Sequence, residues 1–274
     1  MSLTATILGC ASSGGVPRIG YGWGACDPNE PRNRRRRCSL LVERQGPQGK
    51  TTLLIDTGPD VREQLLDARV EWVDGVLYTH EHADHTHGID DLRVLAIYKR
   101  RLVDVYADER TAALLRLRFG YCFETPHGSQ YPPILTLHAM EVGKPVTING
   151  AGGAITALPF LQNHGDIQAL GFRIGDFAYS SDVNGLPDDS IAALAGLDTW
   201  IVDSLRPEPH PSHWSLPETL EMITRLKPRR SVLTNMHTDL DYGTLLRDLP
   251  PGIEPGFDGM RFELCANAPS ATPL

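Results

Sequence analysis

The stretch His80-Glu81-His82-Ala83-Asp84-His85 places three imidazoles and one carboxylate beside a glutamate, directly after the apolar run Gly75-Val-Leu-Tyr78. Imidazole and carboxylate groups are the ligand types that hold Zn, Mn or Fe in open catalytic sites. In a tight loop the first two histidines can converge on one ion, while the aspartate and the third histidine face a neighbouring ion roughly 3.5 to 4 Å away. A solvated polar loop is the alternative, but so many imidazoles behind an apolar strand favour a metal site.

A different zinc motif begins in the same way. The helical zinc-protease signature His-Glu-x-x-His requires a second histidine four residues after the first. Position 84 is Asp, so the sequence does not match that signature.

Short apolar runs and helically spaced apolar positions alternate on both sides of this stretch. Strands are predicted at residues 52–55, 75–78, 103–106, 155–158, 172–174, 177–180, 200–203 and 231–234. Helices are predicted around residues 60–68, 89–99, 109–119 and 216–227, and the last begins with a possible capping box, Ser215-Leu-Pro-Glu218. The alternation indicates an α/β fold. Because the strands over 155–180 are joined by turns such as Gly175-Asp176, we expect mixed rather than purely parallel sheets.

Composition narrows the class of protein. The chain has 274 residues and no low-complexity linker, so we expect a single domain over residues 1–274. A net charge of −8 argues against bulk attraction to nucleic acid or anionic membranes. The start of the chain lacks the pattern of a signal peptide and no run reaches membrane-spanning length, so we expect a cytoplasmic protein without membrane contact. Scattered cysteines indicate reduced thiols: Cys10, Cys26, Cys38, Cys122 and Cys265.

The run His-x-His-x-Asp-His resembles the hallmark of the metallo-β-lactamase superfamily, and other segments match that family in order. Leu54-Ile-Asp56-Thr-Gly58 resembles its first motif, whose aspartate supports the site without binding metal. By the same resemblance, His164 is the third histidine of the first metal, Asp182 bridges both metals and His237 completes the second. The implied metal ligands are His80, His82, Asp84, His85, His164, Asp182 and His237. The resemblance implies a four-layered αβ/βα sandwich with two mixed β-sheets, and two divalent ions, Zn or Mn, with Fe also compatible.

The segment ending His210-Pro-Ser-His213 is similar to one in the PhnP-like phosphodiesterases, as are Gly9–Pro17 and Pro31–Ser39. That resemblance implies that His213 lies outside the metal shell and faces the scissile phosphate, where an imidazole can assist the leaving alkoxide. Asp84 would also orient the nucleophile. The predicted activity is hydrolysis of a small, possibly cyclic, phosphodiester such as phosphoribosyl 1,2-cyclic phosphate or a nucleotide. Family resemblance also suggests a homodimer, and His210 is either a bystander or a support.

One part of the PhnP-like pattern is missing. The four positions that correspond to its structural zinc ligands are Tyr21, Trp23, Cys26 and Leu240, and a lone cysteine cannot hold a tetrahedral zinc. We therefore expect no structural zinc. The sequence leaves open whether the Gly14-Gly15 loop and the run Arg34–Arg37 meet a phosphate, meet another subunit, or serve as a turn and a solvated surface.

Three other functions share this fold. A tRNA 3′-processing nuclease typically carries a long arm between the third histidine and the bridging aspartate, and the interval from His164 to Asp182 has no room for one. With the acidic net charge, this makes structured nucleic acid an unexpected substrate. A thioester or lactone hydrolase of the glyoxalase II branch adds a helical C-terminal domain, but about 35 residues follow His237. A noncatalytic scaffold would tolerate loss of ligands, whereas all are present here.

Overall fold

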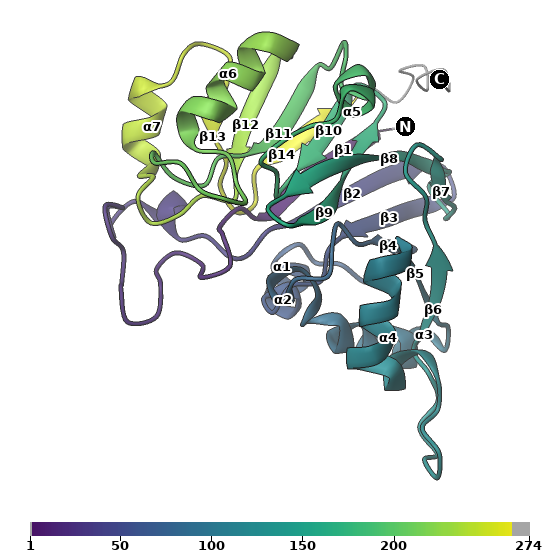
Figure 1. Ribbon diagram of the computed structural model, residues 1–274. Helices are drawn as coiled ribbons and strands as arrows, with labels where there is room; N and C mark the ends of the chain where they lie inside the picture. Colours follow the sequence, from purple (N-terminus) through teal and green to yellow (C-terminus); the bar gives the residue numbers. More distant parts are fainter. Residues whose placement is uncertain (1, 265–274) are drawn as a thin grey trace.

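Two seven-stranded β-sheets face each other in the computed structural model, which describes residues 2–264 (Figure 1). The strand order of the first sheet is β14-β1-β2-β3-β4-β5-β6. Its strands are β1 (Ser2–Gly9), β2 (Ser39–Gly46), β3 (Gly49–Ile55), β4 (Gly75–Leu77), β5 (Val103–Ala107), β6 (Leu135–Ala139) and β14 (Arg261–Leu264). The order of the second sheet is β13-β12-β11-β10-β9-β8-β7. Its strands are β7 (Val146–Ile148), β8 (Ile155–His164), β9 (Ile167–Ile174), β10 (Phe177–Ser180), β11 (Thr199–Asp203), β12 (Arg230–Thr234) and β13 (Ile253–Pro255).

Both sheets are mixed, as predicted. Strands β3 to β6 are parallel to one another, whereas β14, β1, β2 and β3 pair antiparallel. In the second sheet β10 to β13 are parallel, and β7 to β10 are antiparallel. The parallel halves of the two sheets therefore each present a row of carboxyl-terminal strand ends, which is where side chains from consecutive loops can meet.

Helices cover the outer faces of the two sheets (Figure 1). The helices are α1 (Val61–Asp67), α2 (Ala83–Thr86), α3 (Leu92–Lys99), α4 (Glu109–Phe123), α5 (Asp188–Ala193), α6 (Leu216–Leu226) and α7 (Tyr242–Asp248), with short 3₁₀ turns at Pro31–Asn33 and Ile89–Asp91. One apolar core lies between the sheets and includes Leu53, Phe172 and Trp200. A second core lies between the first sheet and its helices. The result is the expected four-layered α/β sandwich, built because each sheet buries an apolar face on both sides.

The predicted elements are present with shifted ends. The strand predicted at 155–158 continues to His164, since buried residues alternate with more exposed ones on both sides of the buried pair Pro159-Phe160. The helix predicted over 89–99 is divided into a 3₁₀ turn and α3. The capping box at the start of α6 is confirmed: the Ser215 backbone N–H donates to Glu218 Oε2 at 2.8 Å, and the Ser215 side chain accepts from the third backbone N–H of the helix.

Four of the five cysteines are buried free thiols, namely Cys10, Cys26, Cys38 and Cys122. Cys265, also expected to be reduced, lies outside the described residues. Within residues 2–264, no helix has both the length and the apolar character needed to cross a bilayer.

Candidate metal centre

The predicted ligands gather where carboxyl-terminal strand ends of both sheets meet. The loop after β4 carries His80 and His82 and continues into α2, whose first residues include Asp84 and His85. His164 is the last residue of β8, and Asp182 follows β10 by two residues. Two segments of the chain that lie about 80 residues apart thus supply one cleft, one from each sheet.

Asp56 organises the first side of the cleft from behind. This fully buried residue directly follows β3 and has a φ of 64°, and its carboxylate accepts hydrogen bonds from the Thr79 N–H and hydroxyl, both at 2.8 Å. Asp56 Oδ2 also lies 2.7 Å from His85 Nδ1, which donates to it. Because Nδ1 is engaged by Asp56, Nε2 is the His85 ring nitrogen that faces the cleft. Asp56 therefore supports the site without pointing into it.

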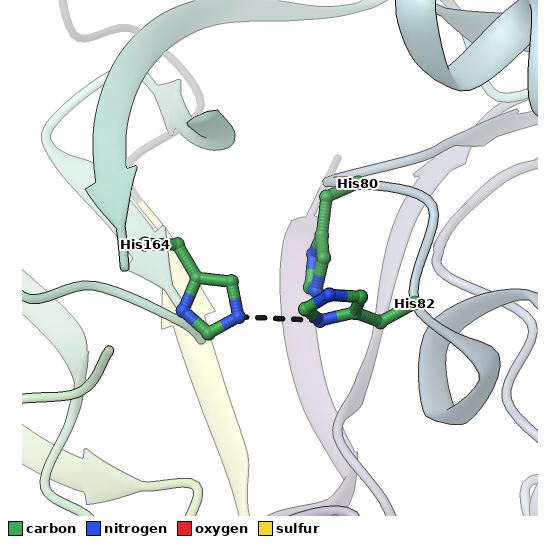
Figure 2. A group of neighbouring side chains, drawn as sticks. All are labelled: His80, His82 and His164. Carbon is green, nitrogen blue, oxygen red and sulfur yellow. Dashed lines mark hydrogen bonds between the residues drawn. The ribbon is translucent and has the colours of Figure 1, made fainter. Parts of the chain in front are cut away.

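Thr79 orients a second imidazole by the same chain of hydrogen bonds. Its hydroxyl donates to Asp56, so its oxygen accepts from His80 Nδ1 at 2.9 Å. The Nε2 atom of His80 then faces the cleft with a free lone pair. On the opposite side, His164 Nδ1 donates to the Ser212 carbonyl at 2.7 Å. Its Nε2 lies 3.2 Å from His82 Nδ1, so these two nitrogens point at one another (Figure 2).

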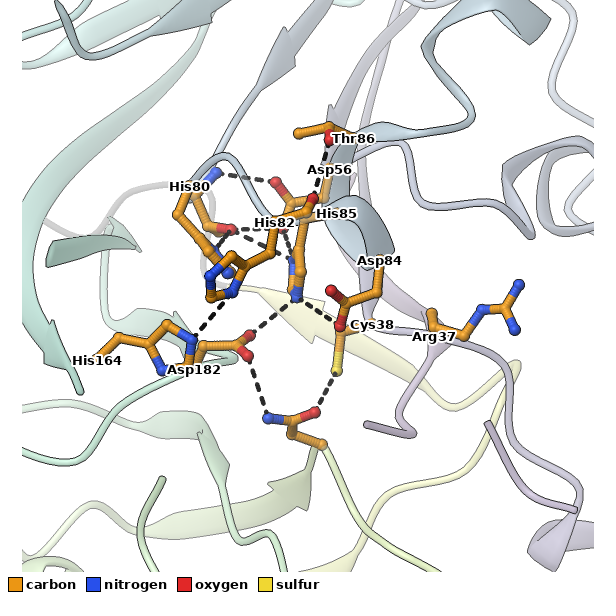
Figure 3. Close-up of polar contacts among 12 residues, drawn as sticks. Arg37, Cys38, Asp56, His80, His82, Asp84, His85, Thr86, His164 and Asp182 are labelled. Atoms are coloured by element: carbon orange, nitrogen blue, oxygen red, sulfur yellow. Dashed lines mark hydrogen bonds and ion pairs between the residues drawn. The ribbon is translucent and has the colours of Figure 1, made fainter. Parts of the chain in front are cut away.

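The ligand atoms form two groups that share one histidine. Nitrogens of His80, His82 and His164 lie within 4.8 Å of one another. Atoms of His80, His85 and Asp182 also lie within 4.8 Å of one another, with His85 Nε2 3.1 Å from Asp182 Oδ2 (Figure 3). Asp84 Oδ2 lies 3.5 Å from His85 Nε2, so Asp84 borders the second group.

The chemistry of the donor set fits divalent cations. Among the described residues, three buried atoms aimed into the cleft have no hydrogen-bond partner: His80 Nε2, His85 Nε2 and Asp182 Oδ2. Leaving buried polar atoms without a partner costs roughly 1–3 kcal/mol each, so a group that satisfies all of them is expected. Imidazole nitrogens and carboxylate oxygens are the ligands of Zn, Mn and Fe.

The electrostatics of the cleft also favour a positive charge there. Burial lowers the pKa of His80 well below its usual value, which keeps its imidazole in the neutral form that binds metal. Burial also acts to lower the pKa of His85, but the carboxylates of Asp182, Asp84 and Asp56 outweigh it and raise that pKa well above its usual value. The clustered carboxylates therefore stabilise a cation at the point that His85 Nε2 faces.

His237 is the predicted final ligand of the second metal. Like Asp84, it lines the cleft but belongs to none of the groups of close ligand atoms. Its Nε2 contacts the guanidinium of Arg18, and its Nδ1 lies 2.6 Å from Asp239 Oδ2. Burial and then the charge of Arg18 lower its pKa. The structure thus places His237 at the mouth of the cleft, beside an arginine.

His213 reaches the cleft from the loop before α6. Its ring forms a third close group with His164 and Asp182, and its Nδ1 lies 3.9 Å from Asp182 Oδ1. The same Nδ1 donates to Asp203 Oδ2 at 2.7 Å. Burial acts to lower the pKa of His213, but the carboxylate of Asp203 outweighs it and raises the pKa to about 9. Asp203 thereby holds the ring in one orientation and favours its protonated form.

The sequence reasoning missed Asp203, although a signal was present. Asp203 is the last residue of the predicted strand 200–203, and it is fully buried. A carboxylate at the carboxyl end of a buried parallel strand lies where loops converge, so its position alone made it a candidate. His210, three residues before His213, also lines the cleft, with its Nδ1 3.2 Å from Ser212 Oγ.

The arginine run is a set of structural contacts and not a solvated face. Arg35 is buried and donates to Asn33 Oδ1 at 3.1 Å. Arg36 pairs with Asp258 at 3.1 Å and with Asp67 at 2.8 Å. Arg37 pairs with Asp60 at 2.7 Å, and the Arg34 guanidinium lies over the Trp23 ring. Acidic partners from distant segments engage Arg36 and Arg37, so the run, whose role the sequence leaves open, is not simply a solvated surface.

The Gly14-Gly15 loop is a tight turn. Gly15 has a φ of +66°, and a side chain at Gly14 would collide with the Arg18 guanidinium. Of the positions that correspond to the structural zinc ligands, Cys26 is buried, with its Sγ 3.5 Å from the Leu240 carbonyl oxygen, while Tyr21 is exposed. The expected lack of a structural zinc stays a prediction.

Known proteins place this fold and site in a family. The family model described as Beta-lactamase superfamily domain matches residues 51–236. The crystal structure of a diphosphatase from the PhnP family superposes with a TM-score of 0.85 at 34% identity, covering 97% of this chain and 99% of that one. Zinc-bound PqqB from Methylobacterium extorquens has the same fold at 17% identity, with a TM-score of 0.72 over 95% of this chain and 100% of that one. The chain therefore belongs to the metallo-β-lactamase superfamily of metal-dependent hydrolases. Within that superfamily it is PhnP-like.

One curated relative carries a different name. An octanoyltransferase from Porphyromonas gingivalis (strain ATCC BAA-308 / W83) is 32% identical over 259 residues, which cover 93% of this chain. The chain spans 50% of the length of that protein. The match therefore does not by itself assign acyl transfer to this chain.

Proposed function

We propose that the protein hydrolyses a small phosphodiester, with two divalent ions held by His80, His82, Asp84, His85, His164, Asp182 and His237. The substrate class includes cyclic esters such as phosphoribosyl 1,2-cyclic phosphate and nucleotides. The observation that carries the proposal is the pair of ligand groups that share His80, with His213 beside them. Two adjacent cation sites suit a phosphoryl group, because the attacking and leaving oxygens both need stabilisation.

The protein side chains supply positioning and proton transfer. Divalent ions bound in the cleft would lower the pKa of a water molecule and offset charge on the phosphoryl oxygens. Asp84 borders the cleft and is placed to accept a hydrogen bond from the attacking water. His213 is held by Asp203 at Nδ1, so its Nε2 is the atom left to donate a proton to the departing oxygen. The pKa of about 9 for His213 favours the form that can donate.

A second candidate is hydrolysis of a diphosphate linkage. It is favoured by the similarity to the PhnP-family diphosphatase, which covers nearly the whole of both chains. The chemistry is the same displacement at phosphorus, with a phosphate in place of an alkoxide as the leaving group. The lower basicity of that leaving group makes a proton donor less important, so the two candidates predict different effects of losing His213.

The polynucleotide alternative has little structural support. The interval between His164 and Asp182 is occupied by β9 and β10, which continue the second sheet. No long arm interrupts this part of the chain. Together with the negative net charge, this favours a small substrate over structured RNA.

The proposal is tested by a parallel assay of a 2′,3′-cyclic nucleotide, ribose 1,2-cyclic phosphate, bis(p-nitrophenyl) phosphate, a nucleoside diphosphate and a thioester. The protein is stripped of metal and then loaded with Zn, Mn or Fe. We expect the highest kcat/KM with a phosphodiester, because that ratio measures discrimination between substrates. Highest turnover of the thioester would contradict the proposal, and highest turnover of the diphosphate would select the second candidate.

Two variants separate metal binding from catalysis. Asp182→Ala is expected to lose bound metal and activity together, since Asp182 faces both His85 and the group around His164. His213→Ala is expected to retain metal and to lose roughly 10²-fold or more in phosphodiester hydrolysis. Metal content is measured by elemental analysis beside the rate. An unchanged rate in His213→Ala would remove that residue from the catalytic role.

A further inference from the structure

Asn235 lies at the end of the third of three neighbouring parallel strands that lead to the cleft. Strand β10 is followed by Asp182, β11 ends at Asp203, and β12 is followed directly by Asn235. Side chains at the carboxyl ends of neighbouring parallel strands meet at one edge of a sheet. Asn235 is buried and lines the cleft. The strand order therefore brings it to the same edge as Asp182 and Asp203.

The carboxamide of Asn235 lies between Asp182 and His213. Its Nδ2 donates to Asp182 Oδ1 at 3.3 Å and lies 3.0 Å from His213 Nδ1. Asp182 Oδ1 and His213 Nδ1 are themselves 3.9 Å apart, which is too far for a hydrogen bond. One amide nitrogen thus contacts both the proposed bridging carboxylate and the proposed proton donor.

The amide is itself held in place. On its other side, the buried Cys38 thiol donates to Asn235 Oδ1 at 3.9 Å. The backbone is fixed at the next residue, where the Met236 N–H donates to the Cys10 carbonyl at 2.9 Å. Asn235 has a φ of 57°, in the left-handed region that asparagine adopts more readily than most side chains do. These contacts leave the amide little freedom to move away from Asp182.

We propose that Asn235 is a positioning residue, which fixes the proton-donating His213 relative to the metal-bridging Asp182. This inference rests on the proposed phosphodiesterase function. Asp182 helps to locate the phosphoryl group through the metal site, whereas His213 must reach the oxygen that leaves. Proton transfer needs a distance of about 2.6–3.2 Å between donor and acceptor, so the spacing of these two side chains affects the rate. Asp203 holds the orientation of the His213 ring, and Asn235 sets its distance from Asp182.

Glycine is the substitution that isolates the side chain of Asn235. Alanine at this φ would add backbone strain, whereas glycine adopts the left-handed conformation freely. Asn235→Gly therefore removes the carboxamide without straining the backbone. Lys227→Gly is the matched control, because Lys227 is exposed and also has a positive φ, 51°. We expect the control to keep its kcat within about twofold of the native protein.

Two diesters that differ only in the leaving group measure the effect on His213. They are phenyl thymidine 5′-phosphate and p-nitrophenyl thymidine 5′-phosphate, and the more basic phenolate depends more on a proton donor. With saturating metal, we expect kcat of Asn235→Gly to fall by about tenfold or more with the phenyl ester and by less than about threefold with the p-nitrophenyl ester. KM should change little with either ester. A purely structural role would lower kcat equally for both, and equal losses would overturn the inference.

A titration of the metal-free protein with Zn gives a readout that does not depend on activity. Asn235 donates to Asp182, and the loss of such a partner typically weakens metal binding by about 10- to 100-fold. We expect Asn235→Gly to bind Zn at least about tenfold more weakly than the native protein, and Lys227→Gly to bind it equally well. If the native protein hydrolyses neither diester, the proposed phosphodiesterase function fails, while the titration still tests the contact between Asn235 and Asp182. An unchanged affinity for Zn in Asn235→Gly would overturn the inference.

Discussion

At the scale of single residues, four of the imidazoles around the cleft are each oriented by a partner behind the ring. Four such pairs are present: His80 with Thr79, His85 with Asp56, His164 with the Ser212 carbonyl, and His213 with Asp203. Each partner engages Nδ1, which leaves Nε2 directed at the cleft. Partners of this kind fix the tautomer and the orientation of a ring, and their loss typically costs 10- to 100-fold in affinity or activity.

Asp203 is the partner whose role is most open to measurement. In Asp203→Asn the side chain keeps its shape but loses its charge, so it orients and stabilises the His213 imidazolium less well. We expect kcat for the phosphodiester to fall by about 10- to 100-fold, with metal content and KM little changed. The double variant Asp203→Asn/His213→Ala should be no slower than His213→Ala alone, because Asp203 acts through that ring.

A structural role for Asp203 makes a different prediction. Asp203 Oδ2 also accepts a hydrogen bond from the Val183 backbone N–H at 3.0 Å. Loss of that bond alone would lower the melting temperature and slow both His213-containing and His213-lacking proteins by the same factor. If the fold-losses in kcat of the two single variants multiply in the double variant, Asp203 does not act through His213.

The positions of the site residues along the chain explain which of them could be predicted from sequence. The stretch from His80 to His85 is contiguous, so its ligand types and their spacing can be recognised from the sequence alone. Asp203 and Arg206 come from the end of β11 and the loop that follows it, whereas Arg18 comes from the N-terminal part of the chain. Their closeness to the ligands depends on strand order and on the path of two loops. His237 lines the same cleft as the other predicted ligands, and its role as the final ligand of the second metal stays a prediction.

At the scale of elements, Asp241 ties the N-terminal loop to α7. Its carboxylate caps that helix by accepting from the Thr244 N–H at 2.8 Å. It also accepts from the Asp27 N–H at 3.0 Å and from the Asn33 amide at 2.7 Å. Partial burial acts to raise its pKa, but these hydrogen bonds outweigh it and lower the pKa to about 2. The ionised form is therefore bound more tightly in the folded chain than in the unfolded one.

This cap predicts a pH-dependent stability difference. A carboxylate whose pKa falls from about 3.9 in the unfolded chain to about 2 in the folded chain stabilises the fold above pH 4. That contribution is lost as the pH falls toward 2. Asp241→Ala should lower the free energy of unfolding by about 1–2 kcal/mol at pH 7, and the gap from the native protein should narrow below pH 4. Urea unfolding at several pH values measures it.

The other end of α7 supplies the control. Asp248 is exposed in the last turn, where a negative charge faces the negative end of the helix dipole. Asp248→Ala should leave stability unchanged or slightly raised at pH 7. If the free energy of unfolding of Asp241→Ala differs from that of the native protein by the same amount down to pH 2, the hydrogen bonds do not favour the ionised carboxylate.

At the scale of the whole molecule, the mixed character of the sheets was predictable, but the pairing of strands from the two ends of the chain was not. Runs such as Val103–Ala107 and Thr199–Asp203 identify buried strands because buried residues dominate them: the residues of β5 alternate between buried and partly buried, and every residue of β11 is buried. Strand β14 pairs with β1 from the other end of the chain, with Leu264 opposite Leu3. No local pattern in a four-residue strand reveals a partner more than 250 residues away, because the pairing depends on the assembled core.

The two-sheet arrangement makes the metal ligands a bridge between halves of the molecule. His80 and His85 follow a strand of the first sheet, whereas His164 and Asp182 end or follow strands of the second. Ions bound by all four would join the halves, and a ligand that binds only the folded chain stabilises it by about 2.7 kcal/mol at 100 times its Kd. For a chain of this size that corresponds to a melting temperature about 5–10 °C higher.

We expect dialysis against a chelator to lower the melting temperature by this amount and Zn or Mn to restore it. Asp182→Ala should show no response to metal, while the exposed His127→Ala should respond like the native protein. Equal melting temperatures with and without metal in the native protein would mean that the ligands do not hold ions across the two sheets.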